Sequence, residues 1–530
     1  MRLNLFLRRF LGFLTVLVLA FSPAVSAEVN FVFVVPEGPA EKKNVAELKD
    51  VPIVQVRGGR AFSFRSLLPG ENPRSDSIKS RITKSGAIRK TLELWDLARK
   101  KAPAPCQQWI SGDSLVPIWV IPKESGGKGL GLISLVPIRI GTGQNFFFAS
   151  QLLLVGDLKT PKEGVISLEE MMGANLLVPM VCHEIFHGIQ SDLMRERFLL
   201  LDSFAQGFGM PHDSPLETDP RTAFKEGFAE GGELWLAGLF PGEFYFPKTG
   251  NFSMRPEVKS FSSAMCKRRI TLASRNRYIF EADGKKKDGR LNSGSSDLAT
   301  EGVIASLIFT LFGHVKWQNP PREIFAAISN SSPLTLFDLV NQLIKENPSQ
   351  APTIRRILLE YTCYTIASSE ALSRYENYYL SRKSFLAGKL PRDEYQKIHS
   401  MWQDWKAAQL KRIEAGAPLS GAVPQPLVVS NKQGYTLDLH DEDIDRLAWH
   451  LEAFFPPGNP DEIRNLSASY AQRIVSKRKE IGVFESIKEL EGLVPNWLFL
   501  KLQAGFRRYL LKSEKAVDLE ISRRRRLFSN

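Results

Sequence analysis

The chain has 530 residues, with 70 Lys and Arg against 57 Asp and Glu, which gives a formal charge of +13. This length exceeds what one hydrophobic core supports, so we expect two or three domains. The basic excess favours anionic surfaces but does not by itself indicate nucleic-acid binding. Four cysteines make disulfides accessory at most, and the sequence does not choose among the three pairings of Cys106, Cys182, Cys266 and Cys363.

The N-terminal 27 residues have the form of a secretory signal peptide. Arg2, Arg8 and Arg9 make the start basic, an apolar run spans 10–21, and small residues predict cleavage after Ala27. The alternatives are an uncleaved membrane anchor and, from the paired arginines, a twin-arginine signal. We expect an exported protein, periplasmic or secreted, in a bacterial cell envelope. Cleavage removes three Arg and no acid, so the formal charge falls from +13 to +10.

An N-terminal region (28–100) and a main domain (101–415) are predicted to contain both strands and helices. No apolar run after the signal segment reaches transmembrane length, and VIASLIFTLF at 303–312 is a core helix by its length. Strands are predicted by β-branched and aromatic runs, and a helix by TLELWDLARKK. The strands are expected at 30–35, 116–122 and 145–158, and the helix at 91–101.

The most specific motif of the chain is HEIFH at 183–187. On an α-helix, His183 and His187 are one turn apart and share a face, where two neutral imidazoles can take two corners of a tetrahedral Zn²⁺ site. Glu184 follows the first histidine and can serve as general base toward a water at that metal. The alternative is an ordinary helix with coincidental histidines.

The residues around HEIFH predict a helix. Ser167 and Glu170 have the spacing of a capping box. Pro179 either interrupts that helix or starts a new one. Apolar residues then recur at helical spacing around the two histidines. Cys182 precedes a candidate ligand and is interpreted as a small core residue.

A third zinc ligand is expected from the segment RTAFKEGFAEGGELWLAG at 221–238. A catalytic zinc site needs three protein ligands and an open fourth position. Glu226 is the natural candidate, with 38 residues between it and His187. The alternative is a solvated acidic pair of Glu226 and Glu230. The aromatic residues around Glu226 instead favour a partly buried carboxylate, and a buried carboxylate needs a partner such as a metal.

The two motifs together resemble the gluzincin metallopeptidases, the thermolysin-like and aminopeptidase-like group. In that group an HExxH helix is followed by a second helix whose Glu binds zinc. The string EGFAE at 226–230 is similar to the EGFA-type segment of the aminopeptidase branch. The resemblance covers about residues 165–240.

The resemblance implies a role for each matching residue. His183, His187 and Glu226 would be the zinc ligands, with Glu184 as the base. Glu230 would hydrogen-bond to the first ligand histidine and fix its tautomer. The fold would be α+β with a zincin-like core, in which the edge strand of a sheet can align an extended substrate.

The sequence departs from the gluzincin pattern at Lys225, where the family commonly has Asn. The family also uses a Tyr or His beyond the third ligand to stabilise the oxyanion, and Tyr278 or His314 could serve. His212, in a Gly- and Pro-containing loop, could border the cleft.

The C-terminal part is predicted to be a separate small helical domain. Residues 372–415 predict two helices broken at 388–391. The segment EAGAPLSGAVPQP at 414–426 has the composition of a linker, which we extend to 414–429. The helical domain with a basic tail follows at 430–530.

Within that domain, 471–493 resembles helix-hairpin-helix domains of the competence DNA receptor and of the type II secretion pseudopilin K. DNA-binding versions carry Gly-rich hairpins, whereas here the corresponding segments read NLSASY (465–470) and LVPNWL (493–498). This argues against DNA binding, so we interpret the basic residues at 477–479 and 523–526 as a solvated face and a tail. The matching residues are Ala471, Ile474, Val475, Arg478, Gly482, Phe484, Ser486 and Leu490.

The sequence therefore predicts an exported zinc metallopeptidase that acts on a peptide or protein substrate, with a C-terminal domain that docks a protein partner or is structural. One alternative is a non-catalytic envelope or secretion-assembly protein on a zincin scaffold. Another is a DNA-uptake or DNA-processing protein that binds DNA through residues 430–530.

Overall fold

The computed structural model describes residues 31–37, 51–56, 59–102, 116–121, 130–142, 145–160, 164–198, 201, 220–244, 278–280, 286–291, 297–313, 316–368, 370–417, 428–430, 436–439, 444–481, 484 and 487–505. Within these ranges helices predominate beside a small mixed sheet, so the expected α+β class is confirmed. No helix among the described residues is long and apolar enough to cross a membrane. The signal segment 1–27 and most of the linker lie outside the described ranges.

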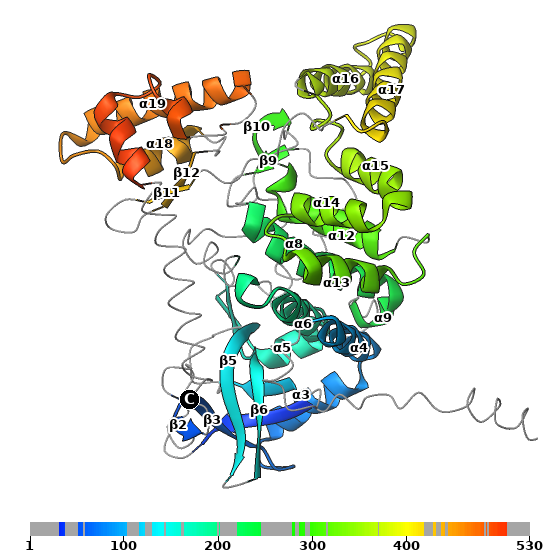
Figure 1. The fold of residues 1–530 in the computed structure, drawn as a ribbon, viewed down its shortest axis with the longest axis vertical. Coiled ribbons are helices and arrows are strands. Elements are labelled where there is room, and N and C mark those ends of the chain that lie inside the picture. The colour runs from blue at the N-terminus through cyan, green and yellow to red at the C-terminus, as the bar shows by residue number, and fades with distance from the viewer. Residues whose placement is uncertain are drawn as a thin grey trace, which may run out of the picture.

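Six strands form one sheet in the order β1-β4-β6-β5-β3-β2, and β1 also pairs with β3, so the sheet closes on itself. Strands β2, β3, β5 and β6 are labelled in Figure 1. The pairs β1–β4, β4–β6 and β3–β5 are parallel. The pairs β5–β6, β1–β3 and β2–β3 are antiparallel. The strands are β1 (Phe31–Pro36), β2 (Ile53–Val56), β3 (Gly59–Ser66), β4 (Val116–Val120), β5 (Leu130–Thr142) and β6 (Asn145–Val155).

Strand β4 separates two hydrophobic cores. Ile118 and Val120 belong to the main core under the helices. Trp119 and the following Ile121 belong to a smaller core on the other side of the sheet. Since successive side chains of a strand point to opposite faces, a strand covered on both faces needs a continuous apolar run. The strands expected at 30–35, 116–122 and 145–158 are confirmed as β1, β4 and β6.

Helices pack on the main-core side of the sheet and extend away from it (Figure 1). They are α3 (Pro73–Lys84), α4 (Gly86–Lys101), α5 (Leu168–Gly173), α6 (Leu177–Met194), α8 (Pro220–Leu239), α9 (Pro241–Phe244), α12 (Glu301–Phe312), α13 (Pro320–Ser331), α14 (Leu336–Glu346), α15 (Ala351–Tyr361), α16 (Ala371–Leu386) and α17 (Arg392–Glu414). Shorter elements are β7 (Leu158–Thr160), β8 (Gly164–Ile166), η4 (Arg195–Arg197), β9 (Tyr278–Phe280), β10 (Lys286–Leu291) and η5 (Pro348–Gln350).

The helix predictions are confirmed. The expected helix at 91–101 is part of α4, and the expected core helix at 303–312 is α12, which is buried along most of its length. Ser167 and Glu170 form the capping box of α5. Pro179 lies in the first turn of α6, so it starts a new helix. The two helices expected in 372–415 are α16 and α17.

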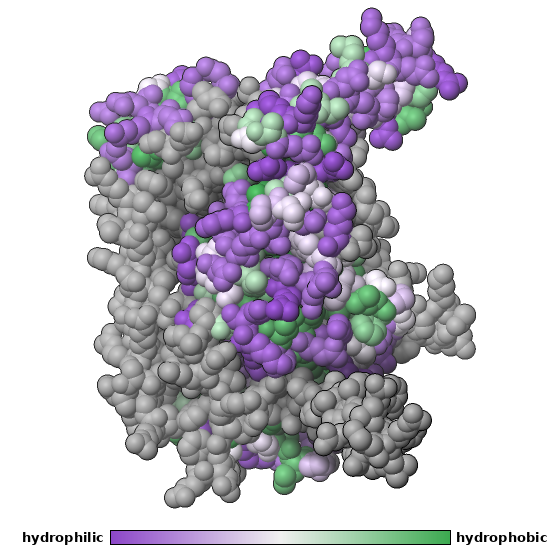
Figure 2. Space-filling model, turned by 45° about the vertical axis from the view of Figure 1, so that its right-hand side comes forward, coloured by the Kyte–Doolittle hydropathy of each residue, from purple (hydrophilic) through white to green (hydrophobic). Residues whose placement is uncertain are grey.

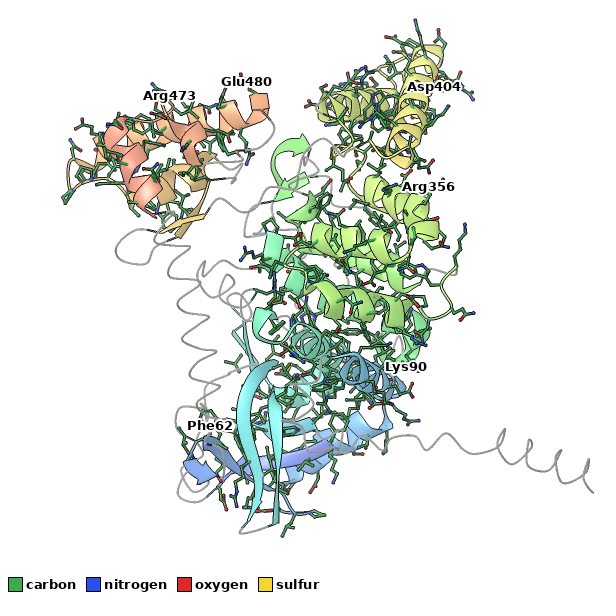
Figure 3. All side chains as sticks on the ribbon, viewed as in Figure 1. Phe62, Lys90, Arg356, Asp404, Arg473 and Glu480 are labelled. Atoms are coloured by element: carbon green, nitrogen blue, oxygen red, sulfur yellow. The ribbon has the colours of Figure 1, made fainter. Side chains whose placement is uncertain are left out.

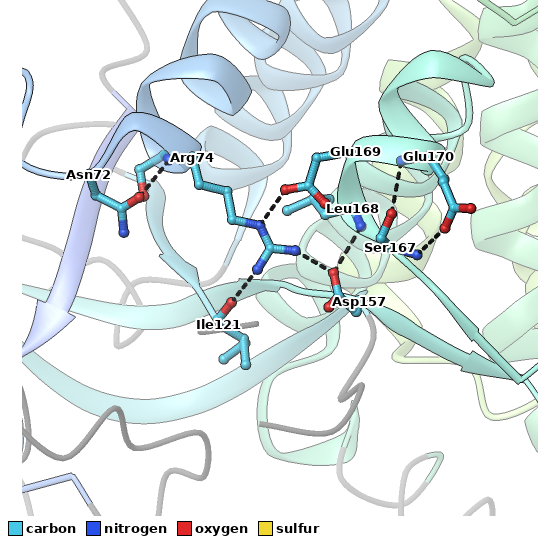
Figure 4. Close-up of polar contacts among 9 residues, drawn as sticks. Asn72, Arg74, Ile121, Asp157, Ser167, Leu168, Glu169 and Glu170 are labelled. Atoms are coloured by element: carbon cyan, nitrogen blue, oxygen red, sulfur yellow. Dashed lines mark hydrogen bonds and ion pairs between the residues drawn. The ribbon is translucent and has the colours of Figure 1, made fainter. Parts of the chain in front are cut away.

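Arg74 of α3 connects the sheet to the helices that follow it (Figure 4). Its Nη1 donates to the carbonyl of Ile121 at 3.2 Å, and its Nε lies 3.0 Å from Oε1 of Glu169. It also forms an ion pair with Asp157, whose carboxylate accepts a 2.9 Å hydrogen bond from the backbone N–H of Leu168. These contacts fix where α5, and then α6, leave the sheet.

Three glycines let α8 lie unusually close to two other helices. A Cβ on Gly231 would lie 2.7 Å from both the carbonyl oxygen of Ala305 and Cβ of Ile308, so α8 and α12 are in backbone contact there. One turn earlier, a Cβ on Gly227 would likewise lie 2.7 Å from Cβ of Ile304 in α12. On another side, a Cβ on Gly232 would lie 2.4 Å from the ring of Phe186 in α6.

The C-terminal residues form a core of their own around β11 (Val428–Ser430), β12 (Thr436–Asp438), α18 (Ile444–Glu452), α19 (Pro460–Ile481), η6 (Ile487–Leu490) and the helical residues 496–505. The matching residues Ile474, Val475, Phe484 and Leu490 are all buried in it. α19 is described as far as Ile481, and Gly482, which is expected to end this helix, lies outside the described residues.

Two details of the expected helix-hairpin-helix pattern are wrong. NLSASY at 465–470 lies inside α19 and is helical, because the segment contains neither glycine nor proline to break the helix. Arg478 is buried rather than solvated, whereas its neighbour Lys477 pairs with Glu480 at 2.9 Å. Figure 3 shows Arg473 and Glu480 on this helix. The described part of this module therefore offers fewer free cations than its sequence suggests.

We predict that Gly231→Ala destabilises the protein. The added methyl group would press into the α12 backbone, and overpacking of this kind costs about 1–3 kcal/mol. Gly238→Ala in the same helix is the control, since nothing lies within 4 Å of a Cβ there. Thermal unfolding should show a lower melting temperature for Gly231→Ala and an unchanged or slightly higher one for Gly238→Ala. Equal melting temperatures would contradict the close packing of α8 on α12.

We also predict that limited proteolysis cuts first within 414–426, because exposed Pro-, Ala- and Gly-rich segments are poorly protected. The released C-terminal fragment should stay helical in circular dichroism, since its core is separate. It should bind duplex DNA only weakly at physiological salt. Tight binding in a titration would instead support the DNA-uptake alternative.

Candidate metal centre

Helix α6 is held in place by a buried carboxylate, Asp192, just after the HEIFH motif. Its Oδ2 accepts hydrogen bonds from Nε1 of Trp95 at 2.6 Å and from Nε of Arg99 at 3.2 Å. Its Oδ1 accepts one from Nε2 of Gln151 in β6 at 2.7 Å. The Arg99 guanidinium lies 4.5 Å from the centroid of the Trp95 ring. These bonds fix the rotation of α6 about its axis, and with it the direction of the two histidines.

His183, His187 and Glu226 come together between α6 and α8, as expected. Nε2 of His187 lies 3.1 Å and Nε2 of His183 lies 3.4 Å from the same oxygen, Oε2 of Glu226. One ligand atom from each residue lies within 4.8 Å of the other two. His187 and Glu226 are buried, and His183 is only slightly more exposed.

Two of the three distances among these atoms are close to those around a zinc ion, and the third is within 4.8 Å. Zn–N and Zn–O bonds of about 2.0–2.2 Å in a tetrahedron place neighbouring ligand atoms about 3.3–3.5 Å apart. The two nitrogen-to-carboxylate distances, 3.1 and 3.4 Å, are close to this value. Two imidazoles and one carboxylate are also a donor set that zinc prefers, and the set leaves a coordination position for water or substrate.

The carboxylate that contacts the other ring nitrogen of His183 comes from Glu233. Its Oε2 lies 3.5 Å from Nδ1 of His183, within ion-pair distance but too far for a hydrogen bond. The resemblance placed Glu230 in this position, and Glu230 is buried in the same helix. Glu233 was missed, although its spacing of seven residues from Glu226 puts both on one face of α8.

Lys225, which replaces the Asn of the gluzincin pattern, contacts the candidate ligand itself. Its Nζ lies 3.3 Å from Oε1 of Glu226, the oxygen that does not face the histidines. The ammonium also lies 5.9 Å from the ring centroid of Phe198. Glu226 thus presents one oxygen to the histidines and the other to a cation, which suits a carboxylate that binds a metal through a single oxygen.

The buried charges of the centre shift each other's pKa. Burial on its own lowers the pKa of His183, but the carboxylates of Glu226, Glu233 and Glu184 outweigh it and raise that pKa well above its usual range. Burial on its own raises the pKa of Glu226, but His187, Lys225 and His183 outweigh it and hold that pKa well below its usual range. The carboxylates therefore stabilise a positive charge between α6 and α8.

Glu184 and Cys182 flank His183 and differ in their surroundings. Glu184 is half-buried, as a group must be that exchanges protons with a water and a substrate. Cys182 is fully buried, and its Sγ lies 3.4 Å from Oγ1 of Thr91. Burial raises the pKa of the Cys182 thiol, so the thiol stays protonated and is no metal ligand. The interpretation of Cys182 as a core residue is confirmed.

The other residues considered for the site are not placed beside it. His212 and His314 lie outside the described residues. Tyr278 begins the short strand β9, and the described ranges do not include its side chain. Cys106 and Cys266 are also outside the described ranges, and Cys182 and Cys363 form no disulfide with each other.

We predict that the protein without residues 1–27 contains about one Zn²⁺ per chain. His183→Ala or Glu226→Ala should remove it, because each deletes one of three ligands. Glu233→Gln should keep the metal but weaken its affinity about 10- to 100-fold, which is typical for loss of a carboxylate behind a ligand histidine. Elemental analysis and competition with a zinc chelator would measure both effects.

The control for the zinc measurements is His399→Ala, which removes a histidine of α17 outside the cluster. It should leave the zinc content unchanged. Wild-type protein that lacks stoichiometric metal after preparation with zinc, or equal zinc content in all four variants, would contradict the site.

Comparison of the chain with protein-family models, with curated proteins and with solved structures found no match. A functional proposal for this chain is therefore based on its own residues. The converging atoms of His183, His187 and Glu226 are the most specific of these.

Proposed function

We propose that this chain is a zinc-dependent hydrolase that cleaves peptide bonds. The observation that carries the proposal is the convergence of two imidazole nitrogens of one helix on a single carboxylate oxygen of another, at 3.1 and 3.4 Å. The HExxH spacing adds Glu184, the group that a hydrolase needs beside such a centre. The proposed zincin-like core and the assignment to the gluzincins rest on the same residues.

Each residue has a distinct part in the proposed reaction. A zinc ion bound by His183, His187 and Glu226 would polarise the scissile carbonyl and lower the pKa of a water. Glu184 takes the proton of the attacking water and then delivers it to the leaving amine. Glu233, whose Oε2 lies 3.5 Å from Nδ1 of His183, would orient this imidazole with Nε2 free to bind a metal.

An extended substrate would need a free strand edge near the metal centre. Because β1 pairs with β3, β2 is the outermost strand, and it lies far from α6 and α8 (Figure 1). It cannot align a substrate at the centre. The first half of β5, Leu130–Ser134, pairs only with β6 among the described strands, and β5 contacts α6. We assign the substrate-aligning edge to this half of β5.

Export and peptide substrates belong to the same proposal. The signal segment would place the enzyme in the periplasm or outside the cell. A partner docked on the C-terminal module would bring the enzyme to its substrate. Neither feature is needed for the chemistry at the centre.

We predict that Glu184→Gln retains zinc and loses peptidase activity. The amide preserves the shape of the side chain but cannot accept the proton, and loss of a general base lowers the rate about 10²- to 10⁴-fold. Digestion of a peptide library, with and without a zinc chelator, measures the activity. The control is Glu323→Gln, which removes a half-buried carboxylate of α13, far from the centre in sequence.

The outcomes separate the proposal from its alternatives. Chelator-sensitive cleavage that survives in Glu323→Gln and is lost in Glu184→Gln supports a zinc peptidase. Full activity of Glu184→Gln would refute the assigned base. Zinc-loaded wild-type protein that cleaves no peptide would favour the non-catalytic scaffold.

A further inference from the structure

A small cavity lies away from the metal centre, where α15, α16 and α17 meet. Its volume is ≈ 140 Å³. A cavity of about 150 Å³ holds one benzene molecule, so this one has room for a single ring. Figure 2 shows that the surface around the projecting α16 and α17 is mostly hydrophilic, with a few hydrophobic side chains.

Aromatic side chains form the inner wall of this cavity. Trp402 and Tyr375 are buried, with ring centroids 5.7 Å apart. The ring of Tyr378 stacks on Trp402 with centroids 5.6 Å apart and an interplanar angle of 13°. Tyr364 also lines the cavity and is buried. Such a wall favours a flat apolar group over a polar one.

The charges around the cavity favour an anion. Lys406 lies 3.2 Å from the carboxylate of Glu360 and 4.7 Å from the ring centroid of Tyr364, so these two partly exposed charges neutralise each other. Arg382 is exposed at the mouth and has no hydrogen bond or ion pair with the described residues. A cationic ligand would have to displace Lys406, whereas an anionic one meets an unused guanidinium.

The backbone beside the cavity is held in a conformation that residues with side chains seldom adopt. Cys363 and Tyr364 have φ angles of 49° and 62°, and both line the cavity. Two consecutive left-handed residues without glycine persist only when their surroundings enforce them, and such residues cluster at binding sites. Here both residues of the turn line the cavity.

We propose that this cavity binds a single-ring aromatic acid, with the ring against Trp402 and Tyr375 and the carboxylate on Arg382. Two sources have this chemistry: a free aromatic acid, and the C-terminal aromatic residue of a peptide. The site does not depend on the metal centre, so its ligand binds equally well after zinc is removed.

The test uses the full mature chain and isothermal titration calorimetry with three probes. N-acetyl-L-phenylalanine has both the ring and the carboxylate, its primary amide lacks the charge, and N-acetyl-L-alanine lacks the ring. We expect saturable binding of the first probe, about fivefold weaker binding of the amide, since an exposed ion pair contributes up to about 1 kcal/mol, and none of the third. The peptide Gly-Gly-Phe then identifies the source, because tighter binding than the free acid indicates a peptide end.

Matched variants make the test specific. Arg382→Gln should weaken binding of the acid about fivefold and leave binding of the amide unchanged. Lys383→Gln removes the same charge one residue away, outside the cavity lining, and should change neither. Tyr378→Leu should weaken both probes. The proposal is overturned if acid and amide bind equally, if Arg382→Gln binds like wild type, or if no probe saturates the protein.

Discussion

The arrangement of the candidate metal centre depends on how closely α8 packs against α6. The side chain of Glu226 in α8 can reach both imidazoles of α6 only if the two helix backbones lie close together. Gly232 permits this, because a Cβ there would lie 2.4 Å from the ring of Phe186. On its other side α8 is pressed against α12 through Gly227 and Gly231. The segment EGFAEGGE at 226–233 therefore supplies the carboxylates of Glu226 and Glu233 and the glycines that bring them to the histidines.

Aromatic packing keeps the three helices in this arrangement. The ring of Phe312 in α12 lies 6.0 Å from that of Phe186 in α6 and 6.1 Å from that of Phe228 in α8. Phe186 and Phe228 are also in edge contact at 6.1 Å. Since close-packed interiors transmit small displacements, replacing one of these three phenylalanines would move Glu226 relative to the histidines. The core and the centre are therefore coupled through one layer of side chains.

Local features were predictable from the sequence, and contacts between distant segments were not. The one-turn spacing of His183 and His187 follows from helix geometry alone, and Glu226 follows from a motif. Asp192 and Glu233 were missed because their partners are brought to them only by the packing of α6 against α4 and α8. Closure of the sheet was missed for the same reason, since the sequences of β1 and β3 carry no signal that the two strands pair. NLSASY was misassigned where a family pattern was preferred to local helix propensity.

Charge balance gives an independent reason to expect a divalent cation. The carboxylates that act on His183 are those of Glu184, Glu226 and Glu233. Lys225 is the cation paired with Glu226. With both histidines neutral, as ligands must be, these three carboxylates and the one ammonium together carry two negative charges. Such charge is costly unless it is compensated, and one divalent ion compensates it in full. In the metal-free protein, a proton on His183 compensates only one of the two negative charges. Metal binding should therefore release that proton.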